Sequence, residues 1–310
     1  MKKTGKFHII FDQRAHNEKD LQEGVEKMQR LGHSVFTKQI EEPDDAVRYA
    51  GEAAAQGSNT VVAVGGDGML SLVVTGILQK RSKAPCEIGL IPFGTANDFA
   101  GACGIPSDDF PAALDIILQT EPVPVDVGQV NGTFFINAVV GGFPAEAVKD
   151  TSRKTKALLG KFAYLATGLA NIGNLAPKNV RFSAPGFEWE GPVYAFGLGN
   201  SRQAGGGIQF SPKAVVNDRL LDLMIMPESE EGLVSLVSDF SRLSRLDETD
   251  RIIYRRVPGL DVASHETLHI NLDGEPAQGK DFHFRVYKYR LPFHLPKDSP
   301  VLGPPSTGDG

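Results

Sequence analysis

Glycine and acidic residues occur together directly after an apolar, β-branched run. Gly65-Gly66-Asp67-Gly68 follows the predicted buried strand 60–64 and precedes a predicted helix over 69–78. Glycines at such a place let the backbone approach a ligand closely, and the N-terminus of the following helix favours a phosphate group. The alternative is a strand-to-helix turn that only requires positive φ, and these four residues do not decide between the two. The pattern is neither a Walker loop nor a GxGxxG fingerprint.

A second group of small and polar residues follows the next predicted strand, 87–93. Within PFGTANDF (92–99), Thr95 offers a hydroxyl and Asp98 a carboxylate. Capping of a helix by Thr95 or Asn97 is the alternative interpretation. Because ligands bind at the carboxyl ends of parallel strands, we expect the two loops to lie side by side and to share a function.

Three later segments combine glycine with oxygen-bearing side chains. The triple glycine 205–207 loses much conformational entropy on folding, which favours either a close backbone approach to a ligand or a flexible hairpin. Asp218 lies among backbone carbonyls, the oxygen ligands that Mg²⁺ prefers, although a lone aspartate is more often a turn residue. Asp273-Gly274 predicts a hairpin, and Glu275 beside it has the chemistry of a general base toward a hydroxyl.

The elements that would position these residues alternate in the first third of the chain. The patterns predict strands and helices in the order 7–11, 19–31, 34–40, 43–56, 60–64, 69–78 and 87–93. This β-α-β-α-β-α-β order predicts a doubly wound parallel sheet.

From about residue 121 the pattern changes to proline-punctuated strands, with Asn131-Gly132 as a hairpin signal. Only two helical stretches interrupt the strands, near 152–173 and 228–245. We therefore expect an α/β domain over 1–124, an antiparallel β domain over 125–290 and a disordered tail over 304–310.

Composition restricts the class of protein. The 310 residues are 41% hydrophobic and 23% charged, and this length favours two domains. A formal net charge of −6 argues against a general nucleic-acid binder. Two cysteines indicate a reducing compartment. No stretch approaches the roughly 18 apolar residues of a membrane span, so a lipid substrate would be reached from outside the bilayer.

Taken in order, five segments resemble the bacterial lipid kinases related to diacylglycerol kinases, and most closely the YegS-like group. The segments are GGDG (65–68), PFGTANDF (92–99), GNSRQAGGG (199–207), NDRLLDL (217–223) and NLDGEP (271–276). The resemblance covers nearly the whole chain. It implies an N-terminal domain like those of NAD kinase and phosphofructokinase, a C-terminal β-sandwich, ATP in the cleft between them, and a possible return of 291–303 to the first domain.

The same resemblance implies roles for individual residues. Mg²⁺ would bind the Asp218 carboxylate with the backbone oxygens of Val215 and Leu220, and Glu275 would accept the proton of a lipid hydroxyl. Asp67 would orient that hydroxyl or contact the metal through water, and Asp98 would support the Asp67 loop through hydrogen bonds. ATP would lie against Gly65, Gly66, Asp67, Gly68, Met69, Leu70, Ser71, Leu72 and Thr95.

Four positions depart from the family pattern. Met69 stands where threonine is usual, Ser71 and Leu72 where asparagine and glutamate are usual, and Ile40 where threonine is frequent. These changes remove polar groups near the nucleotide, so altered nucleotide affinity or lost activity is an expected alternative.

The function implied is ATP-dependent phosphorylation of a diacylglycerol-like or phospholipid hydroxyl by a cytoplasmic protein that contacts the membrane transiently. Alternatives are a kinase of a soluble hydroxyl compound and a nucleotide sensor without turnover. Basic residues beside the apolar run 157–169 are candidates for binding anionic lipid, with a solvated helix face as the alternative. They are Lys149, Arg153, Lys154, Lys156 and Lys161, and a weaker group is Arg251, Arg255 and Arg256.

Overall fold

The structure is a computed structural model that describes residues 4–12, 18–80, 86–107, 109–142, 177–229 and 251–303. The chain divides into two compact units. The first contains Met1–Val125 and Tyr289–Leu302, and the second contains Asp126–Lys288 and Gly303–Gly310. The predicted helix near 152–173, nearly all of the one near 228–245 and the tail 304–310 lie outside the described residues.

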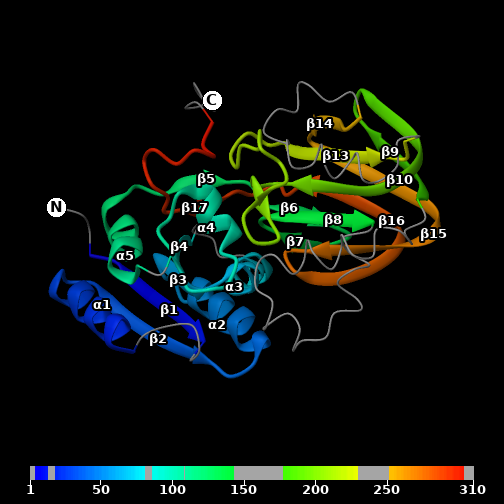
Figure 1. The fold of residues 1–310 in the computed structure, drawn as a ribbon. Helices are drawn as coiled ribbons and strands as arrows, with labels where there is room; N and C mark the ends of the chain where they lie inside the picture. The colour runs from blue at the N-terminus through cyan, green and yellow to red at the C-terminus, as the bar shows by residue number, and fades with distance from the viewer. Residues whose placement is uncertain are drawn as a thin grey trace. The chain divides into compact units, whose positions relative to one another are not determined.

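A six-stranded sheet with the order β2-β1-β3-β4-β17-β5 forms the centre of the first unit (Figure 1). All neighbouring strands run parallel except β17 and β5. The central strand β3 is buried along its whole length, as its continuous apolar run predicts. The strands are β1 (Lys6–Asp12), β2 (Ser34–Ile40), β3 (Thr60–Gly65), β4 (Glu87–Pro92), β5 (Val123–Val125) and β17 (Leu291–Phe293).

Two helix pairs cover this sheet, which lies between them in Figure 1. Helix α2 approaches α3 so closely that a Cβ atom on Gly76 would lie 2.2 Å from the Val47 carbonyl oxygen. Helix α1 packs on α5, where a Cβ atom on Gly24 would meet the Phe110 ring at 2.6 Å. The doubly wound α/β prediction is therefore confirmed. The helices are α1 (Glu18–Arg30), α2 (Pro43–Ala55), α3 (Asp67–Lys80), α4 (Asp98–Cys103) and α5 (Phe110–Gln119).

The second unit is built on a nine-stranded antiparallel sheet with the order β14-β13-β10-β8-β15-β16-β6-β7, in which β9 pairs with both β10 and β15. The long strands β10 and β15 each pair with β8 along one part and with β9 along another. Register shifts separate the two parts, which lets the sheet enclose a core. The strands are β6 (Gly128–Val130), β7 (Thr133–Phe135), β8 (Ala138–Gly142), β9 (Lys178–Ala184), β10 (Phe187–Gly199), β13 (Leu221–Pro227), β14 (Ile253–Val257), β15 (Gly259–Leu272) and β16 (Glu275–Val286).

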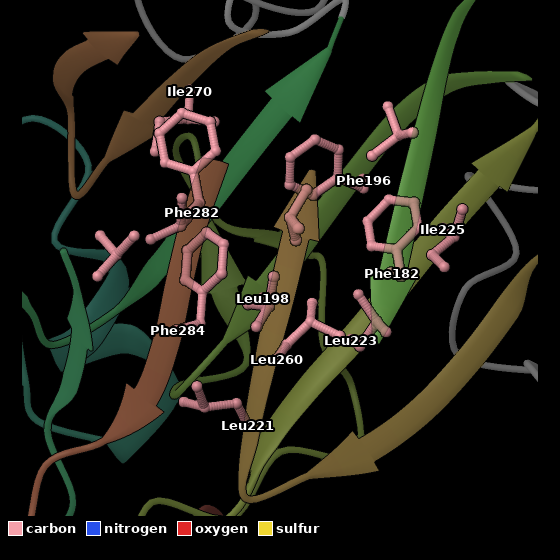
Figure 2. Close-up of a cluster of buried hydrophobic side chains, with 14 of the residues drawn as sticks. Phe182, Phe196, Leu198, Leu221, Leu223, Ile225, Leu260, Ile270, Phe282 and Phe284 are labelled. Atoms are coloured by element: carbon pink, nitrogen blue, oxygen red, sulfur yellow. The ribbon is translucent and has the colours of Figure 1, made fainter. Parts of the chain in front are cut away.

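Strand β13 separates two apolar clusters of this unit. Leu221, Leu223 and Ile225 face the larger cluster, which Figure 2 shows with phenylalanines of β9, β10 and β16. Met224 and Met226 face a smaller cluster on the other side. The alternation follows the period of two of a strand. The antiparallel β-sandwich prediction for the C-terminal part is confirmed.

Candidate functional site

The two glycine loops that follow β3 and β4 are packed backbone to backbone. The Phe93 N–H donates to the Gly65 carbonyl oxygen over 3.0 Å. A Cβ atom on Gly94 would lie 2.4 Å from the Gly66 Cα, and one on Gly66 would lie 2.9 Å from the Gly94 Cα. Glycine is therefore required by this mutual approach of two main chains, and the expected juxtaposition of the loops is present.

The Asp67 carboxylate joins the first loop to the start of α4. One oxygen accepts the Asp98 N–H and the other accepts the Phe99 N–H, both over 2.9 Å. Burial raises the pKa of Asp67, and the neighbouring Asp98 carboxylate adds to the effect, while the two amides oppose it. Asp98 thus supports this loop through its backbone, and Asp67 holds two segments that are 31 residues apart.

Asn97 locks the second loop. Its φ is +52°, its Oδ1 accepts the Gly94 N–H over 2.8 Å, and its Nδ2 donates to the Gly94 carbonyl oxygen over 2.9 Å. Its side chain makes no capping hydrogen bond to α4. Asn97 therefore occupies the N-cap position of α4, but the Asp67 carboxylate accepts the first amides of the helix in place of the Asn97 side chain. The only sequence signal for these bonds to Gly94 was an asparagine three residues after a glycine in a loop.

The expected nucleotide-binding residues divide by exposure. Gly68 and Thr95 are exposed, whereas Met69 and Leu70 are buried. Met69 packs under Gly65, where an added Cβ atom would lie 2.8 Å from the Met69 Cβ. Only the backbone of Met69 and Leu70 is therefore placed to meet a ligand at the surface. Helix α3 begins at Asp67 rather than at residue 69, so Asp67 and Gly68 form its first turn.

Ser71 and Leu72 are both partly buried in α3, and Ile40 is buried at the end of β2. Two of the four departures from the family pattern, Met69 and Ile40, thus lie in the apolar core. At these two positions an apolar side chain packs in the core where the family usually has a threonine.

Glu275 is exposed at the first position of β16, directly after the Asp273-Gly274 turn. The predicted hairpin is present, since Leu272 pairs with Glu275 and both turn residues have positive φ. The Asp273 carboxylate accepts three backbone N–H groups from the segment that leads into β8. That contact was not predicted from the sequence.

Asp218 lies in the loop before β13 and contacts an arginine. Its Oδ1 accepts the Leu220 N–H over 3.0 Å, and its Oδ2 forms an ion pair with Arg256 Nη2. Arg256 Nε also lies 3.8 Å from Oδ1 of the buried Asp222, to which Tyr254 donates a hydrogen bond. Burial raises the pKa of Asp222 to about 6.

No group of three or more histidine, cysteine or acidic side chains suited to a metal occurs among the described residues. The donors expected at Asp218 are one carboxylate and two backbone oxygens, which is the oxygen chemistry that Mg²⁺ prefers. They fit the ion in type, but Arg256 already balances the carboxylate charge.

The triple glycine forms the turn of a small hairpin between β11 (Gln203–Ala204) and β12 (Ile208–Gln209). Gly205, Gly206 and Gly207 have φ of 71°, 96° and 93°, which are conformations that other residues rarely adopt. The turn therefore explains these glycines without a ligand.

The basic residues proposed for lipid binding are only partly described. Lys149, Arg153, Lys154, Lys156 and Lys161 lie outside the described residues. Arg255 lies over the Phe187 ring at 5.5 Å and Arg256 pairs with Asp218, and both residues are exposed. In the part of the chain that the structure describes, no helix combines the length and apolarity needed to cross a bilayer.

Models of two protein families match the chain. The diacylglycerol kinase catalytic domain matches residues 6–130. The YegS C-terminal NAD kinase beta sandwich-like domain matches residues 137–287.

Individual relatives match over almost their whole length. A "probable lipid kinase YegS-like" protein of Xanthomonas axonopodis pv. citri is 37% identical over 304 residues, which cover 96% of this chain and 98% of the relative. A protein with the same name from Pseudomonas aeruginosa is 38% identical over 301 residues, or 97% of each chain.

A crystal structure of a "putative diacylglycerol kinase" from Bacillus anthracis superposes with a TM-score of 0.81. The superposition covers 96% of this chain and 100% of the other at 21% identity, so it describes a shared fold.

Proposed function

This chain belongs to the family of YegS-like lipid kinases with a diacylglycerol kinase catalytic domain, and from that premise we propose that it transfers a phosphoryl group from ATP to a lipid hydroxyl. The proposed acceptor is a diacylglycerol-like lipid or a phospholipid. The proposed place of action is the membrane surface, through transient contact by a cytoplasmic protein.

The observation that carries the proposal is the paired backbone of the Gly66 and Gly94 loops. Neither position has room for a Cβ atom, and Asp67 ties the two loops together. The N-terminus of α3 begins in the first loop, and its free amides favour an anion such as a phosphate group. Exposed Gly68 leaves that end of the helix open to a ligand, because nothing lies within 4 Å of its added Cβ atom.

The proposed chemistry asks the protein mainly to position groups and to balance charge. Bound Mg²⁺ would supply positive charge to the phosphate oxygens. Glu275 would take the proton of the lipid hydroxyl, since it is an exposed carboxylate on a closed two-residue turn. Asp67 would act by holding the two phosphate-binding loops in register and, through its remaining lone pairs, by orienting a hydroxyl or a metal-bound water.

A metal site at Asp218, with the backbone oxygens of Val215 and Leu220, is also proposed. Its oxygen donors suit Mg²⁺. The ion would compete with the Arg256 guanidinium for the Asp218 carboxylate.

A nucleotide sensor without turnover is the second candidate. It is favoured by Ser71 and Leu72, which stand near the start of α3 in place of larger polar groups. Mg²⁺-dependent ATP consumption, measured with and without phospholipid vesicles, separates the candidates. Turnover stimulated by lipid supports the kinase, turnover only with soluble alcohols supports a kinase of soluble compounds, and ATP binding without turnover supports the sensor.

The phosphate-binding role of the first loop can be tested without disturbing the fold. In Gly68→Leu the new side chain enters open space on a helical residue, so we expect an unchanged melting temperature. The same side chain would cover the proposed phosphate site, and we expect ATP affinity to fall at least tenfold in a binding titration. Gln22→Leu, an equivalent exposed change on α1, is the matched control. Equal ATP affinity of the two variants would contradict the proposed site.

A further inference from the structure

The turn that precedes Glu275 is closed by two residues in the left-handed region. Asp273 has φ of +47° and Gly274 has φ of +102°. The Gly274 N–H donates to Asn271 Oδ1 over 2.8 Å. Among the described residues, no side chain forms a hydrogen bond or ion pair with the Glu275 carboxylate. The position of that carboxylate therefore depends on the backbone of the turn.

The Asp273 carboxylate anchors this turn to a distant part of the chain. Its Oδ2 accepts the Ile136 N–H over 2.6 Å, and its Oδ1 accepts the N–H groups of Asn137 and Ala138, each over 3.0 Å. The Asp273 N–H donates in turn to the Ala138 carbonyl oxygen over 3.1 Å. Hydrogen bonds to an ionised acceptor are about twice as strong as neutral ones. The turn is thus held to the start of β8 at four points.

A second turn in the same unit shows that the conformation itself does not require this anchor. Asn131-Gly132 joins β6 to β7 with φ of +47° and +93°. Its asparagine also bonds across to a neighbouring strand, through Nδ2 to the Asp281 carbonyl oxygen and through Oδ1 from the His283 N–H. The Asn131 N–H also donates to the His283 carbonyl oxygen, and Gln129 Nε2 donates to the Gly132 carbonyl oxygen, so that turn is held by neutral hydrogen bonds alone. The turn geometry therefore does not require a negative charge, whereas the Asp273 carboxylate gathers three amide donors.

We infer that Asp273 is a positioning residue that fixes Glu275 relative to the start of β8. The inference rests on the proposed function, in which Glu275 accepts the hydroxyl proton. A proton acceptor must lie within hydrogen-bond reach of its hydroxyl. A displacement of about 1 Å lowers the rate of such a step by about 10²-fold.

Asp273→Asn tests the inference with the least change of shape. The amide keeps one acceptor oxygen and turns an N–H₂ group toward the Ile136 N–H or the other two amides. We expect kcat with lipid and ATP to fall by about 10- to 10²-fold while the KM for ATP stays unchanged. Should this variant fail to fold, Asp273→Glu keeps the charge, displaces the turn by one methylene, and carries the same expectation.

Asn131→Ala is the matched control, because it also removes two hydrogen bonds beside a left-handed turn of the second unit. We expect a lower melting temperature and an unchanged kcat. A fall in kcat that is equal in the control and in Asp273→Asn, at equal loss of melting temperature, would show a structural role only and overturn the inference.

A double variant separates this inference from the proposed function. If Glu275→Gln leaves a measurable residual turnover and Asp273→Asn causes no further loss in that background, Asp273 acts through Glu275. If Glu275→Gln abolishes turnover but Asp273→Asn alone keeps the wild-type kcat, the inference fails and the role of Glu275 stands. Full turnover of Glu275→Gln would overturn both.

Discussion

Three residues in the two units hold their surroundings by contacts that reach far along the chain. Asp67 accepts amides from residues 31 and 32 positions away, and Asp273 accepts amides from residues 135 to 137 positions away. Arg256 contacts Asp218 across a strand pair. Asp67 and Asp273 thereby fix backbone segments, and Arg256 holds the side chain of Asp218.

Asp67→Asn should show how the ionisation of Asp67 changes the free energy of unfolding with pH. The folded-state pKa of Asp67 is raised, chiefly by burial, so its contribution to the free energy of unfolding is fully present below the unfolded pKa. That contribution is lost as pH rises through the raised folded pKa. We expect the stability advantage of the wild type over Asp67→Asn, measured by urea unfolding, to be largest at acidic pH and to shrink toward neutral pH. A gap that widens with rising pH would contradict this account.

Arg256→Met should change the response to Mg²⁺. The variant removes the guanidinium from Asp218 and keeps an apolar stem of similar length, so the carboxylate becomes available to a cation. We expect Mg²⁺ to raise the melting temperature of Arg256→Met more than that of the wild type. An ion at 100 times its Kd stabilises the folded state by about 2.7 kcal/mol. Arg255→Met, one residue away and not paired with Asp218, should respond as the wild type does. No difference between the two variants would argue against a cation site at Asp218.

At the scale of elements, the strands and the first helices could be predicted from the sequence because their signals are local. The run 60–64 is apolar and β-branched, and β3 is Thr60–Gly65. Helix α5 was not predicted, although Asp109 accepts the Ala112 N–H as its N-cap and a proline lies in its first turn. Its apolar residues pack on α1 and on β4, where a Cβ atom on Gly89 would lie 2.6 Å from Ile117.

The candidate site was predictable where glycines mark a close approach of two backbones. The meeting of Gly66 and Gly94 follows from parallel strands whose carboxyl ends share an edge. The partners of Asp67, Asp273 and Arg256 were not predictable, because they depend on register between elements that are distant in sequence. That the amides at the start of α4 bond to Asp67 and not to the Asn97 side chain was unpredictable for the same reason, since Asp67 comes from another loop.

At the scale of the molecule, the first unit is completed by the end of the chain. Strand β17 lies between β4 and β5, so β5 has no other partner in the described sheet. Phe293 of β17 is fully buried and stacks obliquely against Phe99 at 5.4 Å between ring centroids. His294 contacts Glu87 over 3.1 Å and the Thr120 carbonyl oxygen over 3.1 Å. The unit that carries both glycine loops thus needs residues that follow Asp126–Lys288 of the second unit.

Truncation after Lys288 should therefore damage the first unit more than the second. It removes β17 and leaves the edge of β4 and the strand β5 unpaired, with the buried contacts of Phe293 replaced by a cavity. Loss of a buried phenylalanine alone costs about 3–5 kcal/mol, a large fraction of the stability of a domain. We expect the truncated protein to lose ATP binding and to show early hydrogen exchange in β4 and α4, while strands β10 and β15 keep their protection. Truncation after Gly303, which keeps β17, is the control and should retain ATP binding. Equal protection of β4 in both truncated forms would show that the first unit folds without its returning strand.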